Sequence, residues 1–162
     1  QHVAGATGAT SEAAAQLLYG LPDIAMLDMG DFAGAMLKYL RDHRLPRVTI
    51  AGGFAKLAKL AAGHSDLHSS RSQVNTGFLA GLLHDSGAAY SEVTLARSAR
   101  SAGEVLQIAG SHKTALAHAV AERAQQTAVA VLNGRNSSPS SIQLDVLVID
   151  RAGKVLAQSH GR

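Results

Sequence analysis

The chain has 162 residues, which suits one domain with a substantial core and is too short to favour two. Hydrophobic residues make up 46% of the sequence, aromatic residues only 4%, and cysteine is absent. We therefore expect a cytoplasmic protein with a closely packed aliphatic core and no disulfides or thiolate metal sites. No window approaches the ~18 uninterrupted apolar residues of a membrane span, and we see no secretory leader, so no membrane association is expected.

The first part of the chain alternates strand-like runs with helical patterns. Apolar runs at residues 2–4, 24–27 and 47–51 are predicted strands. Each is followed by a loop and a helical pattern, at residues 13–19, 32–41 and 54–60. Thr10 or Ser11 is expected to cap the first helix, and Asp31 the second. Repeated strand–helix units predict a mainly parallel sheet with right-handed crossovers, hence a Rossmann-like α/β fold flanked by helices.

The second part begins with helices and ends with strands. Apolar spacing predicts helices near residues 74–85, 90–96, 104–109 and 112–132, followed by a polar loop at 133–141. Residues 142–149 and 155–158 then form a predicted C-terminal β-hairpin across the turn at Asp150. We expect residues 1–162 to form a single α/β domain.

Ligands of parallel sheets bind beyond the carboxyl ends of the strands. In this chain we expect three loops to gather at that edge, at residues 7–12, 28–31 and 52–53. Asp28 follows Gly8 by twenty positions, the offset at which an acidic residue often holds a ribose. The loop GATGAT is not the GxGxxG fingerprint, however, and an aspartate at a strand end equally fits an ordinary loop residue.

The stretch from Arg47 to Arg71 concentrates polar chemistry. Its glycines, Gly52 and Gly53, allow close approach of a ligand, and the lysines that follow suit an anion. His64, Asp66 and His68 form an H-x-D-x-H string, for which we favour substrate contact or proton transfer over a metal site, because no fourth ligand is near. The alternative is an ordinary strand, turn and helix with solvated lysines and loop-stabilising hydrogen bonds.

Basic residues crowd this same region. The net charge is +3, and few aromatic rings are interleaved with the cations, so a small polycarboxylate or phosphate ligand suits them better than nucleic acid. A solvated basic rim is the open alternative. The cluster comprises Lys38, Arg41, His43, Arg44, Arg47, Lys56, Lys59 and Arg71.

Several familiar catalytic motifs are missing. The sequence has no GxSxG elbow, no cysteine nucleophile, no HExxH and no Gly-Lys-Ser/Thr of a P-loop. Residue patterns alone therefore indicate an α/β domain that binds an anionic or adenosyl ligand.

Two long strings carry a resemblance to a known family. HVAGATGATSEAAAQ at residues 2–16 and IAMLDMGDFAGAMLKYLRDHRLPRVTIAGGFAKLAKLAAGHSDLHSSRSQ at residues 24–73 resemble the carboxyl-terminal half of the CbiD family. Members of this family are cobalt-precorrin-5B C1-methyltransferases of anaerobic cobalamin (vitamin B12) biosynthesis. The resemblance is dense over residues 2–73 and general beyond them.

The resemblance implies methyl transfer from S-adenosylmethionine to carbon 1 of a cobalt-bearing tetrapyrrole rich in carboxylates. It implies the following roles: Thr7, Gly8, Thr10, Ser11, Glu12 and Asp28 for the cofactor; Gly52, Gly53, Lys56 and Arg71 for the substrate; Asp66 or His68 as proton acceptor. It also implies an amino-terminal half that is absent here. Homo-oligomerisation stays open. The competing hypothesis is a non-catalytic nucleotide- or anion-binding module with a Rossmann-like sheet.

Overall fold

The computed structural model describes residues 1–134 and 141–159. Most of the predicted polar loop at 133–141 therefore lies outside the described residues. The chain forms a five-stranded sheet of order β2-β1-β3-β4-β5, in which β1 to β4 are parallel and β5 is antiparallel to β4. This confirms the predicted mainly parallel sheet and C-terminal hairpin. The strands are β1 (His2–Ala6), β2 (Met26–Leu27), β3 (Arg47–Gly53), β4 (Gln143–Ile149) and β5 (Val155–Gln158).

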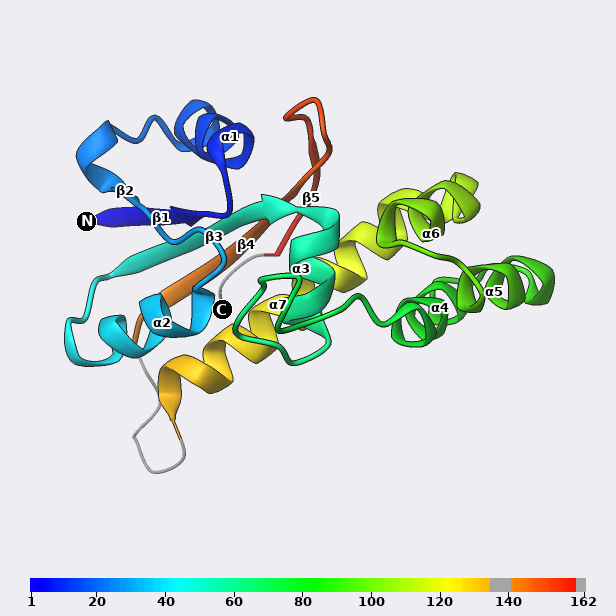
Figure 1. The fold of residues 1–162 in the computed structure, drawn as a ribbon. Coiled ribbons are helices and arrows are strands. Elements are labelled where there is room, and N and C mark those ends of the chain that lie inside the picture. Colours follow the sequence, from blue (N-terminus) through cyan, green and yellow to red (C-terminus); the bar gives the residue numbers. More distant parts are fainter. Residues whose placement is uncertain (135–140, 160–162) are drawn as a thin grey trace.

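Helices cover both faces of the sheet (Figure 1). Among the described helices, α1 covers one face, and α2, α3 and α7 pack against the other. The remaining helices, α4 to α6, form a helical arm that extends beyond α3. The helices are α1 (Ala9–Tyr19), α2 (Ala33–Asp42), α3 (Phe54–Ala61), α4 (Thr76–Asp85), α5 (Tyr90–Arg97), α6 (Ala102–Ile108) and α7 (Lys113–Asn133), with 3-10 turns η1 (Asp23–Ala25) and η2 (Gly110–His112).

Strand β4 shows how the sheet is buried on both faces. Leu144, Val146 and Val148 join the large core under α2, α3 and α7. The alternate residues Leu147 and Ile149 join a smaller cluster under α1. This alternation follows from the two-residue period of a strand, and a run that is apolar on both faces is typical of parallel sheets covered by helices.

The strand order places a reversal point between β1 and β3. From β1 the chain moves to β2 on one side and then crosses to β3 on the other. In register, Ala6 lies beside Ala51 and Ala51 beside Leu147, so the carboxyl ends of β1, β3 and β4 are adjacent. Open α/β sheets bind ligands at such a point.

The structure corrects three local predictions. The predicted strand at 24–27 shrinks to the two residues of β2, because η1 precedes it and leaves Ile24 93% exposed. Helix α1 begins at Ala9 with Gly8 as its N-cap, so neither Thr10 nor Ser11 has that role. Asp31 does not cap α2, whose N-cap is Phe32 without a side-chain bond.

The later helices follow the sequence pattern closely. The long helix predicted at 112–132 is α7, shifted by one residue at each end. Asn75 caps α4 by accepting a hydrogen bond from the Phe78 amide at 2.9 Å. Ser101 caps α6 in the same way through the Glu104 amide at 3.1 Å. Within residues 1–134 and 141–159, no helix combines the length and apolar character needed to cross a membrane.

Candidate functional site

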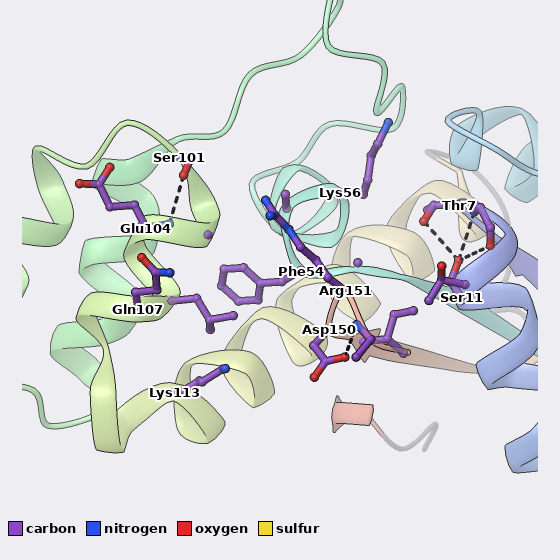
Figure 2. A pocket seen from close by; sticks show the side chains of 18 of the residues that line it. Thr7, Ser11, Phe54, Lys56, Ser101, Glu104, Gln107, Lys113, Asp150 and Arg151 are labelled. Atoms are coloured by element: carbon purple, nitrogen blue, oxygen red, sulfur yellow. Dashed lines mark hydrogen bonds between the residues drawn. The ribbon is translucent and has the colours of Figure 1, made fainter. Parts of the chain in front are cut away.

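A cleft of about 1000 Å³ lies at the carboxyl edge of the sheet (Figure 2). It is bounded by the loop after β1, the start of α3, the wall formed by α6 and the start of α7, and the turn between β4 and β5. The volume reaches the upper end of the range for small-molecule sites. Its lining residues with polar side chains are Thr7, Thr10, Ser11, Lys56, Ser101, Glu104, Gln107, Lys113, Asp150 and Arg151.

The loop after β1 is held by its own polar groups. The Thr7 amide donates to the Ala51 carbonyl at 3.0 Å, which ties the loop to β3. The Ser11 hydroxyl donates to the Gly8 carbonyl at 2.8 Å and accepts from the Gly8 amide at 3.1 Å. Among the described residues, the amides of Ala9, Thr10 and Ser11 have no acceptor, as expected for the first turn of a helix. These amides line the cleft and suit an anionic group.

Two glycines leave room for a ligand. Gly8 has an extended backbone (φ 172°), and Gly53 has φ −67°, so neither conformation requires glycine. A Cβ at either position meets nothing within 4 Å. Their missing side chains therefore widen the cleft.

The predicted substrate residue Gly52 has a different role. It is buried and does not line the cleft. A Cβ built there lies 2.9 Å from Thr7 Cγ2, so this glycine lets Thr7 pack against β3.

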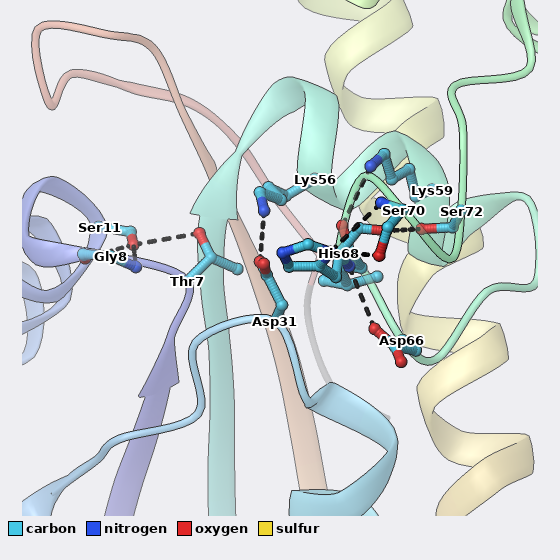
Figure 3. A network of polar contacts seen from close by, with 11 residues as sticks. Thr7, Gly8, Ser11, Asp31, Lys56, Lys59, Asp66, His68, Ser70 and Ser72 are labelled. Carbon is cyan, nitrogen blue, oxygen red and sulfur yellow. Dashed lines mark hydrogen bonds and ion pairs between the residues drawn. The ribbon is translucent and has the colours of Figure 1, made fainter.

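Lys56 lines the cleft but is already paired. Its ammonium forms an ion pair with Asp31, whose backbone carbonyl accepts from the Leu67 amide at 2.8 Å (Figure 3). Asp31 therefore joins the start of α3 to the loop that follows it. Asp31, which was predicted to cap α2, instead holds Lys56 at the edge of the cleft.

The H-x-D-x-H string lies on that following loop, outside the cleft lining. The Asp66 carboxylate accepts from the His68 backbone amide at 3.1 Å, and the His68 ring lies 2.8 Å from the Ser70 hydroxyl. The structure thus shows no ring-to-carboxylate bond within this pair. Arg71 is 74% exposed at 4.0 Å from Asp66, and His64 is exposed. Among the described residues, no three His, Cys, Asp or Glu side chains are grouped to hold a metal.

The predicted basic cluster is divided among structural contacts. Lys59 is buried and donates to the Leu67 carbonyl at 3.0 Å. Burial lowers the pKa of the Lys59 ammonium, and the nearby charge of Lys56 lowers it further. Arg47 pairs with the buried Asp145 at 2.6 Å, and Arg41 donates to the last carbonyls of α7. Three cations of the predicted basic cluster, Lys59, Arg47 and Arg41, therefore make contacts within the chain.

Two predicted cofactor residues lie apart from the cleft. Asp28 follows β2, as expected, but it lies in a separate groove of about 340 Å³ between β2 and α2. Glu12 is exposed on α1 and does not line the cleft. The structure therefore brings together Thr7, Gly8, Thr10, Ser11, Gly53 and Lys56 from the predicted set.

Sequence reasoning missed the rest of the lining. Lys113 and Gln107 come from the wall that the helical arm and α7 provide, and Arg151 comes from the β4–β5 turn. The sequence holds one signal for Arg151: it follows the strand predicted at 142–149, as the loops after β1 and β3 follow their strands. The predicted hairpin does not indicate that this strand pairs in parallel with β3, which is what brings Arg151 to the cleft.

The fold and cleft define a class: a Rossmann-like α/β domain with a cleft at the reversal point of its sheet. The family model "CbiD, C-terminal domain" matches residues 66–160, and the chain therefore belongs to the CbiD family.

Curated relatives extend the match to nearly the whole chain. Proteins of Brucella ovis, Brucella canis and Brucella abortus, each named cobalt-precorrin-5B C(1)-methyltransferase, are 51% identical over 158 residues. The aligned region covers 98% of this chain but 42% of each relative, so the chain spans less than half of their length. No solved structure matches.

Proposed function

We propose that this chain is the ligand-binding part of an S-adenosylmethionine-dependent methyltransferase that acts on carbon 1 of cobalt-precorrin-5B in cobalamin biosynthesis. The observation that carries the proposal is the cleft beside the loop after β1, in a domain of the CbiD family. The names of the Brucella relatives supply the reaction. A cytoplasmic setting, expected from the absence of cysteine, belongs to the same proposal.

The residues of the loop fit the cofactor. S-adenosylmethionine carries a methyl group on a sulfonium, together with an amino-acid carboxylate. The free amides of Ala9, Thr10 and Ser11 suit that carboxylate, and the bare backbones of Gly8 and Gly53 allow close approach. The Thr7 and Ser11 hydroxyls add polar contacts at the same wall. Asp28 would contact a ribose only if the ligand extended past β1 to β2.

Methyl transfer depends mainly on the alignment of the two reacting carbon atoms. Transfer of a methyl group needs the sulfonium carbon and the carbon nucleophile held in line, and a base for any proton that leaves. In this proposal the cofactor lies in the cleft and the macrocycle lies at its edge beside Gly53 and Lys56.

The proposal includes three residues outside the cleft lining. Asp66 or His68 is the proposed proton acceptor, and Arg71 is a proposed substrate-binding residue. The support for them is position: Leu67 bonds to Asp31, and Asp31 pairs with Lys56 at the edge of the cleft. A macrocycle that extends over Asp31 reaches His68 next.

The relatives' additional length belongs to the proposed active site. This chain covers 42% of each relative, so turnover is expected from the longer protein and ligand binding from this domain. A non-catalytic nucleotide- or anion-binding module is the competing function, and it also predicts binding without turnover by the domain.

Calorimetry with S-adenosylhomocysteine tests the proposal. We expect the chain to bind this product, and Gly8→Leu to weaken binding at least about tenfold because the new side chain fills the cleft. Gly81→Leu in α4 is the matched control, since a Cβ there also meets nothing within 4 Å.

Two results separate the competing functions. No binding by this chain or by a full-length relative overturns the methyltransferase assignment. Binding accompanied by methylation of cobalt-precorrin-5B in the full-length protein, and loss of methylation in its Gly8→Leu equivalent, excludes the non-catalytic module.

A further inference from the structure

Two cationic side chains of the cleft have no polar partner among the described residues. Lys113 and Arg151 both line the cleft and are exposed, and neither side chain makes a hydrogen bond or ion pair with any described residue. Lys113 projects from the start of α7, and Arg151 extends from the β4–β5 turn toward the start of α3 (Figure 2). Lys56, by contrast, is engaged by Asp31.

The acidic groups of the cleft, Glu104 and Asp150, accept hydrogen bonds from nearby backbone amides. The Glu104 carboxylate accepts from the Arg100 amide at 2.7 Å. Asp150 Oδ1 accepts from the amides of Ala152 and Lys154 at 2.8 and 2.9 Å. Neither carboxylate forms an ion pair with Lys113 or Arg151 among the described residues, so the donors of these two cations are available to a ligand. This arrangement favours an anionic ligand.

The position of Lys113 is unfavourable for its helix. It is the first residue of α7, a helix of 21 residues, where the macrodipole favours anions and opposes cations. Helix stability therefore does not account for a lysine here. An anion bound in the cleft would offset this unfavourable position.

Part of the lining is apolar, namely Phe54 and Ile149, which are 6% and 2% exposed, and Leu106 of α6. A flat apolar ligand with anionic groups on its rim matches a cleft that combines apolar lining with cationic side chains.

We infer that Lys113 and Arg151 bind rim carboxylates of a tetrapyrrole whose ring lies against Phe54. The ligand class rests on the proposed function, whereas the two residues rest on the geometry of the cleft. The inference adds carboxylate contacts at Lys113 and Arg151 to the one proposed for Arg71. It also gives the helical arm a role, because α6 and the residues after it supply one wall.

Uroporphyrin, a metal-free porphyrin ringed by carboxylates, is the probe. Titrations that follow quenching of its fluorescence are expected to show about tenfold weaker binding for Lys113→Gln or Arg151→Gln, and roughly hundredfold for the double variant. The matched control is Arg123→Gln with Lys154→Gln, which removes the same charge from α7 and the β4–β5 turn, outside the lining. It should bind like the unmodified chain. A cationic porphyrin should not distinguish the variants.

Three outcomes overturn the inference. The first is equal loss in the double variant and its control, which indicates a net-charge effect. The second is a larger loss for Arg71→Ala than for Arg151→Gln, which places the carboxylates on the other loop. The third is no binding of uroporphyrin by a chain that binds S-adenosylhomocysteine, which leaves the proposed function standing. Thermal melts confirm that each variant is folded.

Discussion

At the scale of single residues, Gly52 and Gly53 are adjacent but meet different surroundings. A Cβ at Gly52 lies 2.9 Å from Thr7 Cγ2 and 3.2 Å from Leu57 Cγ, whereas a Cβ at Gly53 meets nothing. We expect Gly52→Ala to destabilise the chain by about 1–3 kcal/mol through overpacking. Gly53→Ala should leave stability within about 0.5 kcal/mol of the original. Urea denaturation measures both, and equal stability of the two variants contradicts the packing assigned to Thr7.

His2 links stability to pH. Burial lowers the pKa of its imidazole below the ordinary 6.5, and the Arg47 guanidinium lowers it further. The folded chain therefore binds this proton less readily than the unfolded chain. The contribution of His2 to stability is present above pH 6.5 and is lost as the pH falls toward the folded-state pKa.

The measurement for His2 is the urea midpoint on either side of pH 6.5, compared with His2→Gln. The variant should show a smaller loss of stability in acid, because it has no imidazole to protonate. An unchanged pH dependence would mean that other groups account for the whole effect.

Residue patterns identified one half of the cleft and missed the other for a physical reason. Thr7, Gly8 and Gly53 follow strands in a local pattern of strand, glycine and helix, which is readable from sequence. Lys113 and Arg151 reach the cleft only through packing between distant segments. Their local sequence is that of a helix start and a turn, and neither pattern indicates a ligand.

At the scale of elements, α7 is anchored at its carboxyl end by α2. Arg41 Nε donates to the Leu132 carbonyl at 3.0 Å, and its Nη2 donates to Val131, so a cation meets carbonyls that lack helical partners. We expect Arg41→Ala to cost about 1–3 kcal/mol of folding free energy. Lys38→Ala, which removes an exposed cation from the same helix, should cost less than about 0.5 kcal/mol.

Thermal unfolding monitored by circular dichroism compares these two variants. Equal melting temperatures for Arg41→Ala and Lys38→Ala contradict the anchoring role. The result also bears on the predicted basic cluster, because Arg41 belongs to it and donates to backbone carbonyls of α7.

The helices could be predicted better than the edge of the sheet. The spacing of Leu116, Val120 and Ala124 marks the buried side of α7, and each is fully buried. The run at 24–27 looked equally apolar, yet it lies at the sheet edge with β1 as its only partner among the described strands, and only Met26 and Leu27 pair. Strand order depends on tertiary packing, which the period of a short apolar run does not encode.

At the scale of the whole molecule, the two faces of the sheet differ in the size of the apolar core that covers them. The face under α2, α3 and α7 has a large core with many leucines. The face under α1 has Leu147 and Ile149 together with five alanines, which bury little apolar area each. Leu17 and Leu18 of α1 are 89% and 46% exposed. Polar contacts partly compensate, including the Gln158 amide that donates to the Tyr19 hydroxyl at 2.7 Å.

This asymmetry predicts that α1 opens more easily than α7. Native-state hydrogen exchange should show lower opening free energies for α1 amides, because few apolar contacts are lost when that helix separates from the sheet. Tyr19→Phe should speed α1 exchange further and leave α7 unchanged, since it removes the bond to Gln158.

Ligand binding should reduce this difference between α1 and α7. In the proposed complex, S-adenosylhomocysteine at the loop after β1 would contact the first turn of α1, so opening of α1 would require release of the ligand. Binding then adds to the opening free energy of α1 by mass action, about 2.7 kcal/mol at one hundred times the dissociation constant. Residues of α7 far from the cleft should gain less unless they open only by global unfolding. Equal protection of α1 and α7 in the free chain contradicts the two-face account. Ligand-induced protection confined to the loop after α3 places the cofactor away from Gly8.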